Sequence, residues 1–277
     1  LCTRLGLPTY TSDFLQPPTT CARFEGWKSL EGTNLSKLLL EHGEEHNLPE
    51  GFAWGAYVPD SEIYMLAGTR VYGADCANAD DLTGAEIEGR RQVRAIMDII
   101  RKHAPQSNIV LQALPSQIGI RETRHIQCQY QLTGDDVLHG RRFDDAIANG
   151  SYRVDIHHQE KPGITFRYLD GTERYVRPGY PTKKGRWREE TVEYPTFYQI
   201  PFRSLVPGKY GNVIVAGRML DADKVAFSAV RVMVNMNQTG EAAGVAAYVA
   251  LDREEDIREL NAETVRELLV KGGSVIT

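Results

Sequence analysis

The sequence lacks the features of a membrane or nucleic-acid-binding protein. It has no uninterrupted apolar run approaching the roughly 18 residues that a membrane-spanning helix needs. Basic residues are not in excess, because 32 Lys and Arg stand against 37 Asp and Glu, for a formal net charge of −5. That balance argues against a general nucleic-acid-binding face. We therefore expect neither a membrane nor a nucleic acid among the partners.

Cysteine is scarce and scattered. Cys2, Cys21, Cys76 and Cys128 form no CxxC pair and no metal-ligand spacing. Reduced, isolated thiols are the simplest interpretation, and they favour a cytoplasmic location. We expect no metal site built on cysteine.

A glycine loop of the G-x-G-x-x-G type, which holds the pyrophosphate of a dinucleotide, is also missing from the 277 residues. The chain begins at Leu1 and not at Met, and its first 18 residues contain Pro8, Pro17 and Pro18. Such a segment is typical of a connector and not of a domain start. We expect the chain to start within a longer protein.

What is present includes several clear local signals. Residues 19–27, 52–58, 62–67 and 69–72 are predicted strands, and with a helix over residues 35–42, capped by Asn34 or Ser36, they predict an antiparallel sheet. A longer amphipathic helix is expected over residues 80–102 and a strand over 108–114. Asp170 and Gly171 predict a tight hairpin between strands 164–169 and 172–176. A final helix capped by Asn261 should run to about Val270.

The run from His42 to His46 fits the H-x-x-E-H pattern, in which two histidines bind zinc and Glu45 acts as a base. That chemistry needs both histidines on one face of a continuing helix. Gly43 follows His42 directly and Pro49 ends the segment, so a solvated helix end is the favoured interpretation. A zinc hydrolase remains a less favoured alternative.

The stretch over residues 212–251 predicts a strand, a glycine loop and a long helix. Residues 212–216 form a short apolar run typical of a buried strand, and Gly217 follows it. Residues 218–229 are expected to be a loop, and residues 230–251 a helix. Gly240 and Gly244 lie four apart on one face of that helix, which would let a backbone or a flat ligand approach closely.

Two further segments carry candidate site residues. Arg121 and Arg124 flank a glutamate and follow a glycine, a pattern that suits either an anion-binding site or a structural ion pair. Residues 141–149 are expected to form a loop and a helix. Beyond them, His157 and His158 are neighbours in a predicted strand and therefore point to opposite faces, so they should not share a metal.

A basic and aromatic tract follows the predicted hairpin, between Arg177 and Arg188. Single-stranded nucleic acid or phosphate can bind such a tract. Because acidic residues lie nearby and the whole chain is acidic, a solvated β-arm or a dimer contact is the favoured interpretation.

Four motifs point to a known family. Residues 200–207, 212–218, 228–233 and 240–244 resemble, in their order and spacing, the carboxy-terminal signature of the bacterial FAD-dependent oxidoreductase family, which has the glutathione-reductase-like fold. Residues 119–124 and 140–148 also resemble this family, so the similarity covers most of residues 60–277.

The resemblance implies an α/β chain of mixed α+β character. It would hold a connector (residues 1–18), a mainly antiparallel-sheet substrate domain (19–115) and the carboxy-terminal part of an FAD-binding domain of the ββα type (116–277), with a β-arm near residues 160–195. The partners would be a small organic substrate, an upstream FAD-binding segment and, in a possible homo-oligomer, a second copy of the chain.

The same resemblance implies that a hydride passes from the substrate to FAD. Arg121, Arg124 and Arg231 would be binding groups and not bases, while His157 or His158 could act as an acid or base near the flavin. Residues that would contact FAD are Gly217, Arg218, Val230, Arg231, Val232, Met233, Gly240 and Gly244. A cofactor-free module for binding or assembly is the alternative.

Overall fold

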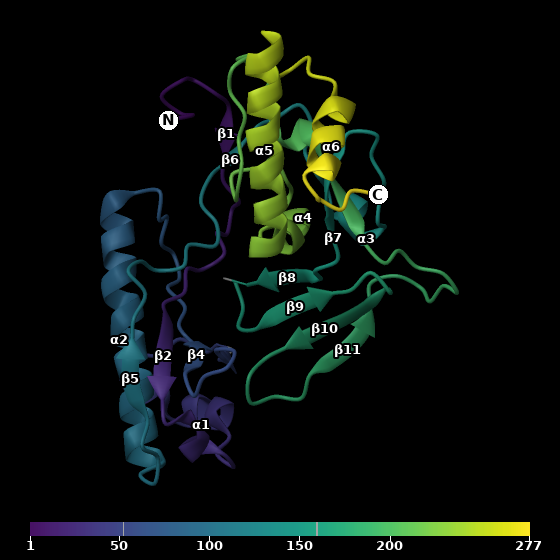
Figure 1. The fold of residues 1–277 in the computed structure, drawn as a ribbon. Coiled ribbons are helices and arrows are strands. Elements are labelled where there is room, and N and C mark those ends of the chain that lie inside the picture. Colours follow the sequence, from purple (N-terminus) through teal and green to yellow (C-terminus); the bar gives the residue numbers. More distant parts are fainter. Residues whose placement is uncertain (52, 159) are drawn as a thin grey trace.

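The computed structural model of the chain describes residues 1–51, 53–158 and 160–277. Its helices and several antiparallel sheets make a mixed α/β protein, which confirms the predicted fold class (Figure 1). Within the described residues, none of the helices combines the length and the apolar character that crossing a bilayer requires.

The first sheet has the strand order β3-β4-β2-β5, with every neighbouring pair antiparallel. Its strands are β2 (Cys21–Glu25), β3 (Trp54–Tyr57), β4 (Tyr64–Ala67) and β5 (Val110–Ala113). Alternation in β2 turns Ala22 and Phe24 into the core. The predicted antiparallel sheet is confirmed, although the expected strand over residues 69–72 is not formed and Phe52 lies outside the described residues.

Helix α2 (Ala79–His103) covers this sheet, as the left side of Figure 1 shows. The Asn78 side chain accepts hydrogen bonds from the N–H groups of Asp80 and Asp81 and so begins the helix. Ile96 and Ile100 are fully buried in one core with Phe24. Each such side chain contributes about 1.5–3 kcal/mol relative to an exposed one.

Shorter helices flank the first sheet. Helix α1 (Leu35–His42) begins at Asn34, whose side chain accepts from Lys37 N, and ends at Gly43, as predicted. The 3-10 turns η1 (Trp27–Leu30) and η2 (Glu44–His46) precede and follow it.

A second sheet, with the strand order β11-β10-β9-β8, lies at the lower right of Figure 1. Its strands are β8 (Val154–His157), β9 (Ile164–Arg167), β10 (Thr172–Val176) and β11 (Lys183–Arg186). Asp170 Oδ1 accepts hydrogen bonds from the N–H and hydroxyl of Thr172, and Gly171 takes φ 86°. The predicted hairpin is therefore confirmed.

Most of the remaining elements share the largest core, around Tyr198, Ile147 and Phe227, while Ile126 packs in a smaller cluster with Leu7 and Val215. Residues 146–150 belong to a strand, so the helix predicted over residues 141–149 is wrong: this apolar run is buried and pairs with β12. The elements are β1 (Thr9–Tyr10), β6 (His125–Ile126), α3 (Gly134–Leu138), β7 (Ala146–Gly150), β12 (Tyr198–Pro201), η3 (Phe202–Leu205), α4 (Lys224–Val230), α5 (Met233–Arg253) and α6 (Ala262–Lys271).

The stretch over residues 212–251 departs from its prediction in three ways. Residues 212–216 form no strand; Val215 N donates to Leu205 O, but a strand needs a partner along its whole length. The expected loop contains α4, because the Asp223 side chain caps Ala226 N at 2.8 Å. The long helix begins only at Met233, after a break at Arg231 and Val232.

Candidate functional site

A cavity of about 500 Å³ lies between the first and second sheets. Four arginines from separate segments line it, together with an apolar wall and the polar residues of β8. The arginines are Arg70, Arg121, Arg153 and Arg231. The apolar side chains include Trp54, Ile164 and Phe166, and the other polar residues include Tyr152, Asp155 and His157. Concave sites of this size, with few converging polar groups, are typical of small-molecule binding.

Arg121 is held in the wall by the segment that leads into β2. Its Nη1 donates to Pro17 O and to Thr19 Oγ1. Burial, with Arg231 and Arg70 nearby, lowers the pKa of Arg121 to about 9, so the guanidinium is still a cation at neutral pH. The repulsion between these cations indicates a site prepared for an anion.

Arg231 lies at the break between α4 and α5. Its Nη2 donates to Asp155 O at 3.2 Å and to Asp155 Oδ2 at 3.4 Å, and both side chains are about nine-tenths buried. Burial alone would raise the pKa of Asp155, but contacts with His157 and the charge of Arg231 lower it to about 2. Asp155 therefore stays ionised and offsets one of the arginine charges.

His157 faces the cavity from β8, with its side chain 10% exposed. Its Nε2 lies 3.2 Å from Asp155 Oδ1, without the alignment of a hydrogen bond. Burial and the charges of Arg121 and Arg231 lower the pKa of His157 to about 4, against the opposing effect of Asp155. The imidazole is therefore neutral at pH 7.

Polar atoms without a hydrogen-bond partner gather in this cavity. Among the described residues, His157 Nδ1, Asp155 Oδ1, Arg231 Nε and Arg153 Nε are buried and make no hydrogen bond. Buried polar groups are nearly always paired, so several orphaned atoms in one cavity call for a ligand.

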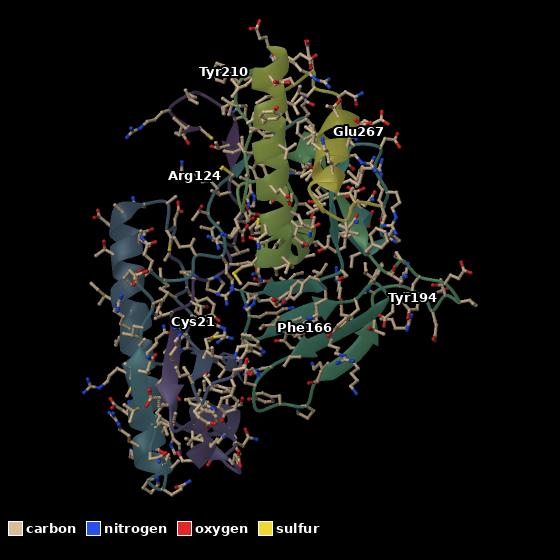
Figure 2. The ribbon with its side chains drawn as sticks, viewed as in Figure 1. Cys21, Arg124, Phe166, Tyr194, Tyr210 and Glu267 are labelled. Atoms are coloured by element: carbon tan, nitrogen blue, oxygen red, sulfur yellow. The ribbon has the colours of Figure 1, made fainter. Side chains whose placement is uncertain are left out.

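The two arginines predicted together are separated. Arg121 lines the cavity, whereas Arg124 is exposed and lies 3.9 Å from Asp75. Figure 2 labels Arg124 beside the connecting segments, far from Phe166 on the cavity wall. Arg124 remains only a predicted site residue.

Four of the residues predicted at the flavin, Val230 to Met233, lie at the start of α5. Val230 is fully buried at the end of α4, Val232 occupies the N-cap position of α5 without a side-chain hydrogen bond, and Met233 is 81% exposed. Figure 1 shows α5 beginning beside α4, above β8. This helix end therefore adjoins the arginine-lined cavity through Arg231.

Three predicted glycines have room around them. Gly217 has φ +84°, and a Cβ added at Gly217, Gly240 or Gly244 would meet nothing within 4 Å in the described chain. Gly240 and Gly244 lie on an exposed face of α5. No other segment of the described chain makes the close approach that was predicted at these two glycines. Arg218 is also exposed, and its pKa is lowered by partial burial and by Arg231.

The H-x-x-E-H segment does not have the geometry of a zinc site. His42 ends α1, while His46 lies in the separate turn η2. The His42 ring stacks instead on His103, with 3.5 Å between ring centroids. In the described part of the chain, no group of three or more His, Cys, Asp or Glu side chains could hold a metal ion.

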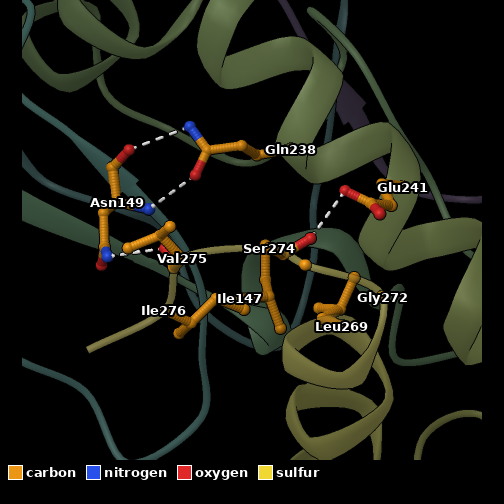
Figure 3. Close-up of a pocket in the computed structure, with 10 residues that line it drawn as sticks. Ile147, Asn149, Gln238, Glu241, Leu269, Gly272, Ser274, Val275 and Ile276 are labelled. Atoms are coloured by element: carbon orange, nitrogen blue, oxygen red, sulfur yellow. Dashed lines mark hydrogen bonds between the residues drawn. The ribbon is translucent and has the colours of Figure 1, made fainter.

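A second cavity, of about 550 Å³, lies beside the carboxy-terminal tail. Figure 3 shows that its polar groups satisfy one another: Gln238 bonds Asn149, Asn149 bonds Val275 O, and Ser274 donates to Glu241. Although slightly larger, this cavity has no cluster of charges along its described lining. The arginine-lined cavity is therefore the better candidate for a chemical site.

Three charged residues that line the cavity were not singled out by sequence reasoning. Arg70 follows β4, Arg153 precedes β8, and Asp155 lies within β8. Nothing in the local sequence marks Arg70. The charged pattern Arg153–Asp155–His157, with alternate residues on one face of a strand, was an available signal.

The comparison with known families gives one match. A family model described as FAD dependent oxidoreductase matches residues 10–269. No curated protein and no solved structure is significantly similar to the chain. The match covers nearly the whole chain, including all four arginines of the cavity.

Proposed function

The chain belongs to the FAD-dependent oxidoreductase family, and on this premise we propose that an organic substrate gives up a hydride to FAD within the arginine-lined cavity. FAD is the cofactor of this family. The observation that carries the proposal is the cavity itself, in which cations and a neutral imidazole adjoin the start of the longest carboxy-terminal helix.

The residues present fit a flavin. Arg231 Nε is buried without a partner, Gly217 leaves open space, and the first turn of α5 has no side-chain cap. A helix start carries a partial positive charge that stabilises an anionic group. Val230, Arg231, Val232 and Met233 would hold the flavin ring, and Gly217 with Arg218 would meet its ribityl or phosphate part. When bound, FAD supplies the two-electron acceptor.

The chain's own residues would orient the substrate and exclude water. Arg121 and Arg231 would bind its charged end, and Trp54 and Phe166 would cover its apolar part. In a buried cavity, these cations act on charge more strongly than they would in bulk water.

An upstream FAD-binding segment would complete the site. The exposed face of α5 carries Met233, Val234, Tyr248 and Leu251 besides its two glycines, and their exposed fractions range from 60% to 81%. Large apolar side chains on one helix face commonly mark an interaction surface. We infer that the upstream segment covers this face, with Gly240 and Gly244 at the closest approach.

The test is the colour and flavin content of the purified protein. A yellow protein, or one that takes up added FAD and shows flavin absorption, supports the proposal. A colourless protein that fails to take up FAD, both alone and with the upstream segment added, leaves the cofactor-free binding module as the function. Arg231→Gln should weaken FAD uptake, whereas Arg124→Gln should not.

A further inference from the structure

The charges of the arginine-lined cavity are unbalanced. Arg121, Arg153 and Arg231 carry positive charge into it, while Asp155 is its anionic lining side chain. His157 adds no charge at neutral pH. Buried charges are stable only when they are compensated, so the cavity is built for an anion.

The orphaned donors show where the anion would lie. Arg231 Nε and Arg153 Nε are buried and have no partner among the described residues, while Arg231 Nη2 is already used by Asp155. A planar carboxylate can accept from the donors of a guanidinium fork on one edge. The lining also has apolar side chains, Trp54 from the first sheet and Ile164 and Phe166 from the second, and these suit the carbon body of the same molecule.

His157 adds the means to move a proton. Its Nε2 faces Asp155, and its Nδ1 is buried in the cavity without a partner. If the Nε2 nitrogen carries the hydrogen, Nδ1 presents a lone pair toward the ligand. His158, one residue on, lies on the opposite face of β8, where it contacts Glu160 and Thr165 instead.

Building on the proposed function, we propose that the substrate is a small organic acid. Arg231 holds its carboxylate, the Arg121 cation beside it adds attraction, and His157 Nδ1 takes the proton released on oxidation. At the oxidised carbon, the C–H bond breaks and its electron pair leaves as a hydride to FAD. The O–H or N–H bond on that carbon breaks, its proton goes to Nδ1, and a C=O or C=N bond forms.

The bound carboxylate prepares His157 for this role. The charged groups that face the imidazole are Asp155 on β8, Arg231 before α5, Arg121 before β6 and, farther along the lining, Arg70 and Arg153. Arg121 and Arg231 disfavour its protonation. A carboxylate between them cancels part of their field, so the imidazole becomes a better base when substrate is present.

Carboxylate binding can be measured on this chain without flavin. The probes are acetate, propionate and benzoate, each compared by calorimetry with its neutral amide. We expect at least one acid to bind about tenfold or more tightly than its amide. Arg121→Gln and Arg231→Gln should remove that preference, and Arg231→Lys, which keeps the charge, should retain part of it. Circular dichroism checks that each variant is folded.

The effect of acid binding on the protonation of His157 can be measured by NMR titration of its ring. The ring signal is assigned as the one lost in His157→Gln. The acid that binds most tightly should raise the proton affinity of this ring about tenfold. His158→Gln, its neighbour on the other face of β8, should leave both the acid affinity and this shift unchanged.

Three results would overturn the proposal: no acid preferred over its amide, an unchanged His157 titration with acid bound, or inorganic pyrophosphate bound more tightly than every acid. The last would assign the arginines to the phosphates of FAD. Flavin uptake without acid preference would refute the organic-acid substrate and leave the oxidoreductase function intact. Acid preference without flavin uptake would refute the oxidoreductase function and leave the organic-acid binding site intact.

Discussion

Replacing His157 by glutamine should flatten the dependence of folding stability on pH. In the folded chain the pKa of His157 is about 4, against 6.5 for an ordinary histidine. Between these two values the unfolded chain binds more protons than the folded one. The contribution of His157 to the stability of the folded chain is therefore fully present above about pH 6.5 and is lost as the pH falls toward 4.

The size of this effect follows from linkage. At about pH 5, the histidine is almost fully protonated in the unfolded chain and almost fully neutral in the folded chain. This difference lowers the free energy of unfolding by about 2 kcal/mol. Glutamine cannot be protonated, so His157→Gln should lose about 2 kcal/mol less than the parent between about pH 7.5 and pH 5. Asp155 contributes little in this window, because its folded pKa is about 2.

Urea unfolding followed by circular dichroism at several pH values measures the difference. His139→Gln is the matched control, because it removes a histidine whose side chain is 53% exposed. The control should keep the pH dependence of the parent. If His157→Gln also keeps it, the imidazole does not lie buried among the arginines, and the reasoning about the cavity fails.

Three further predictions concern stability alone. Gly240→Ala should stabilise the chain by about 0.5–1 kcal/mol in thermal unfolding, because helix propensity rises and nothing lies near the added Cβ; a loss of stability would contradict this. Gly134→Ala should cost about 1–3 kcal/mol, because its Cβ would lie 2.6 Å from Val225; a neutral result would show that Val225 moves aside. Asp223→Ala should cost about 1–2 kcal/mol, since Asp223 accepts from Ala226 N and Gly134 N, both at 2.8 Å; an unchanged melting temperature would refute its role as a cap.

Local signals made much of the fold predictable. Asn34 and Asn261 each accept a hydrogen bond from the first turn of a helix, and the Asp170–Gly171 turn fixes a hairpin. These contacts join residues two or three apart, so the sequence alone displays them. The strand predicted over residues 212–216 failed for the opposite reason, since strand formation depends on a distant partner that an apolar run does not reveal.

The candidate site was predictable only in part. Arg121 was predicted from its local sequence pattern and Arg231 from the family resemblance, and both line the cavity. Arg70 and Arg153 come from segments that tertiary packing alone brings to them. No local pattern distinguishes a guanidinium that enters a cavity from one that enters water, which is also why Arg124 was predicted together with Arg121.

The pairing of β8 with β9 decides which imidazole the cavity contains. His157 is opposite Ile164 in this antiparallel pair, and its neighbour His158 points the other way. A shift of one residue would exchange the two faces of β8. One inserted residue in the turn between these strands would therefore turn His157 away from the cavity and His158 toward it. No residue of the site would be substituted.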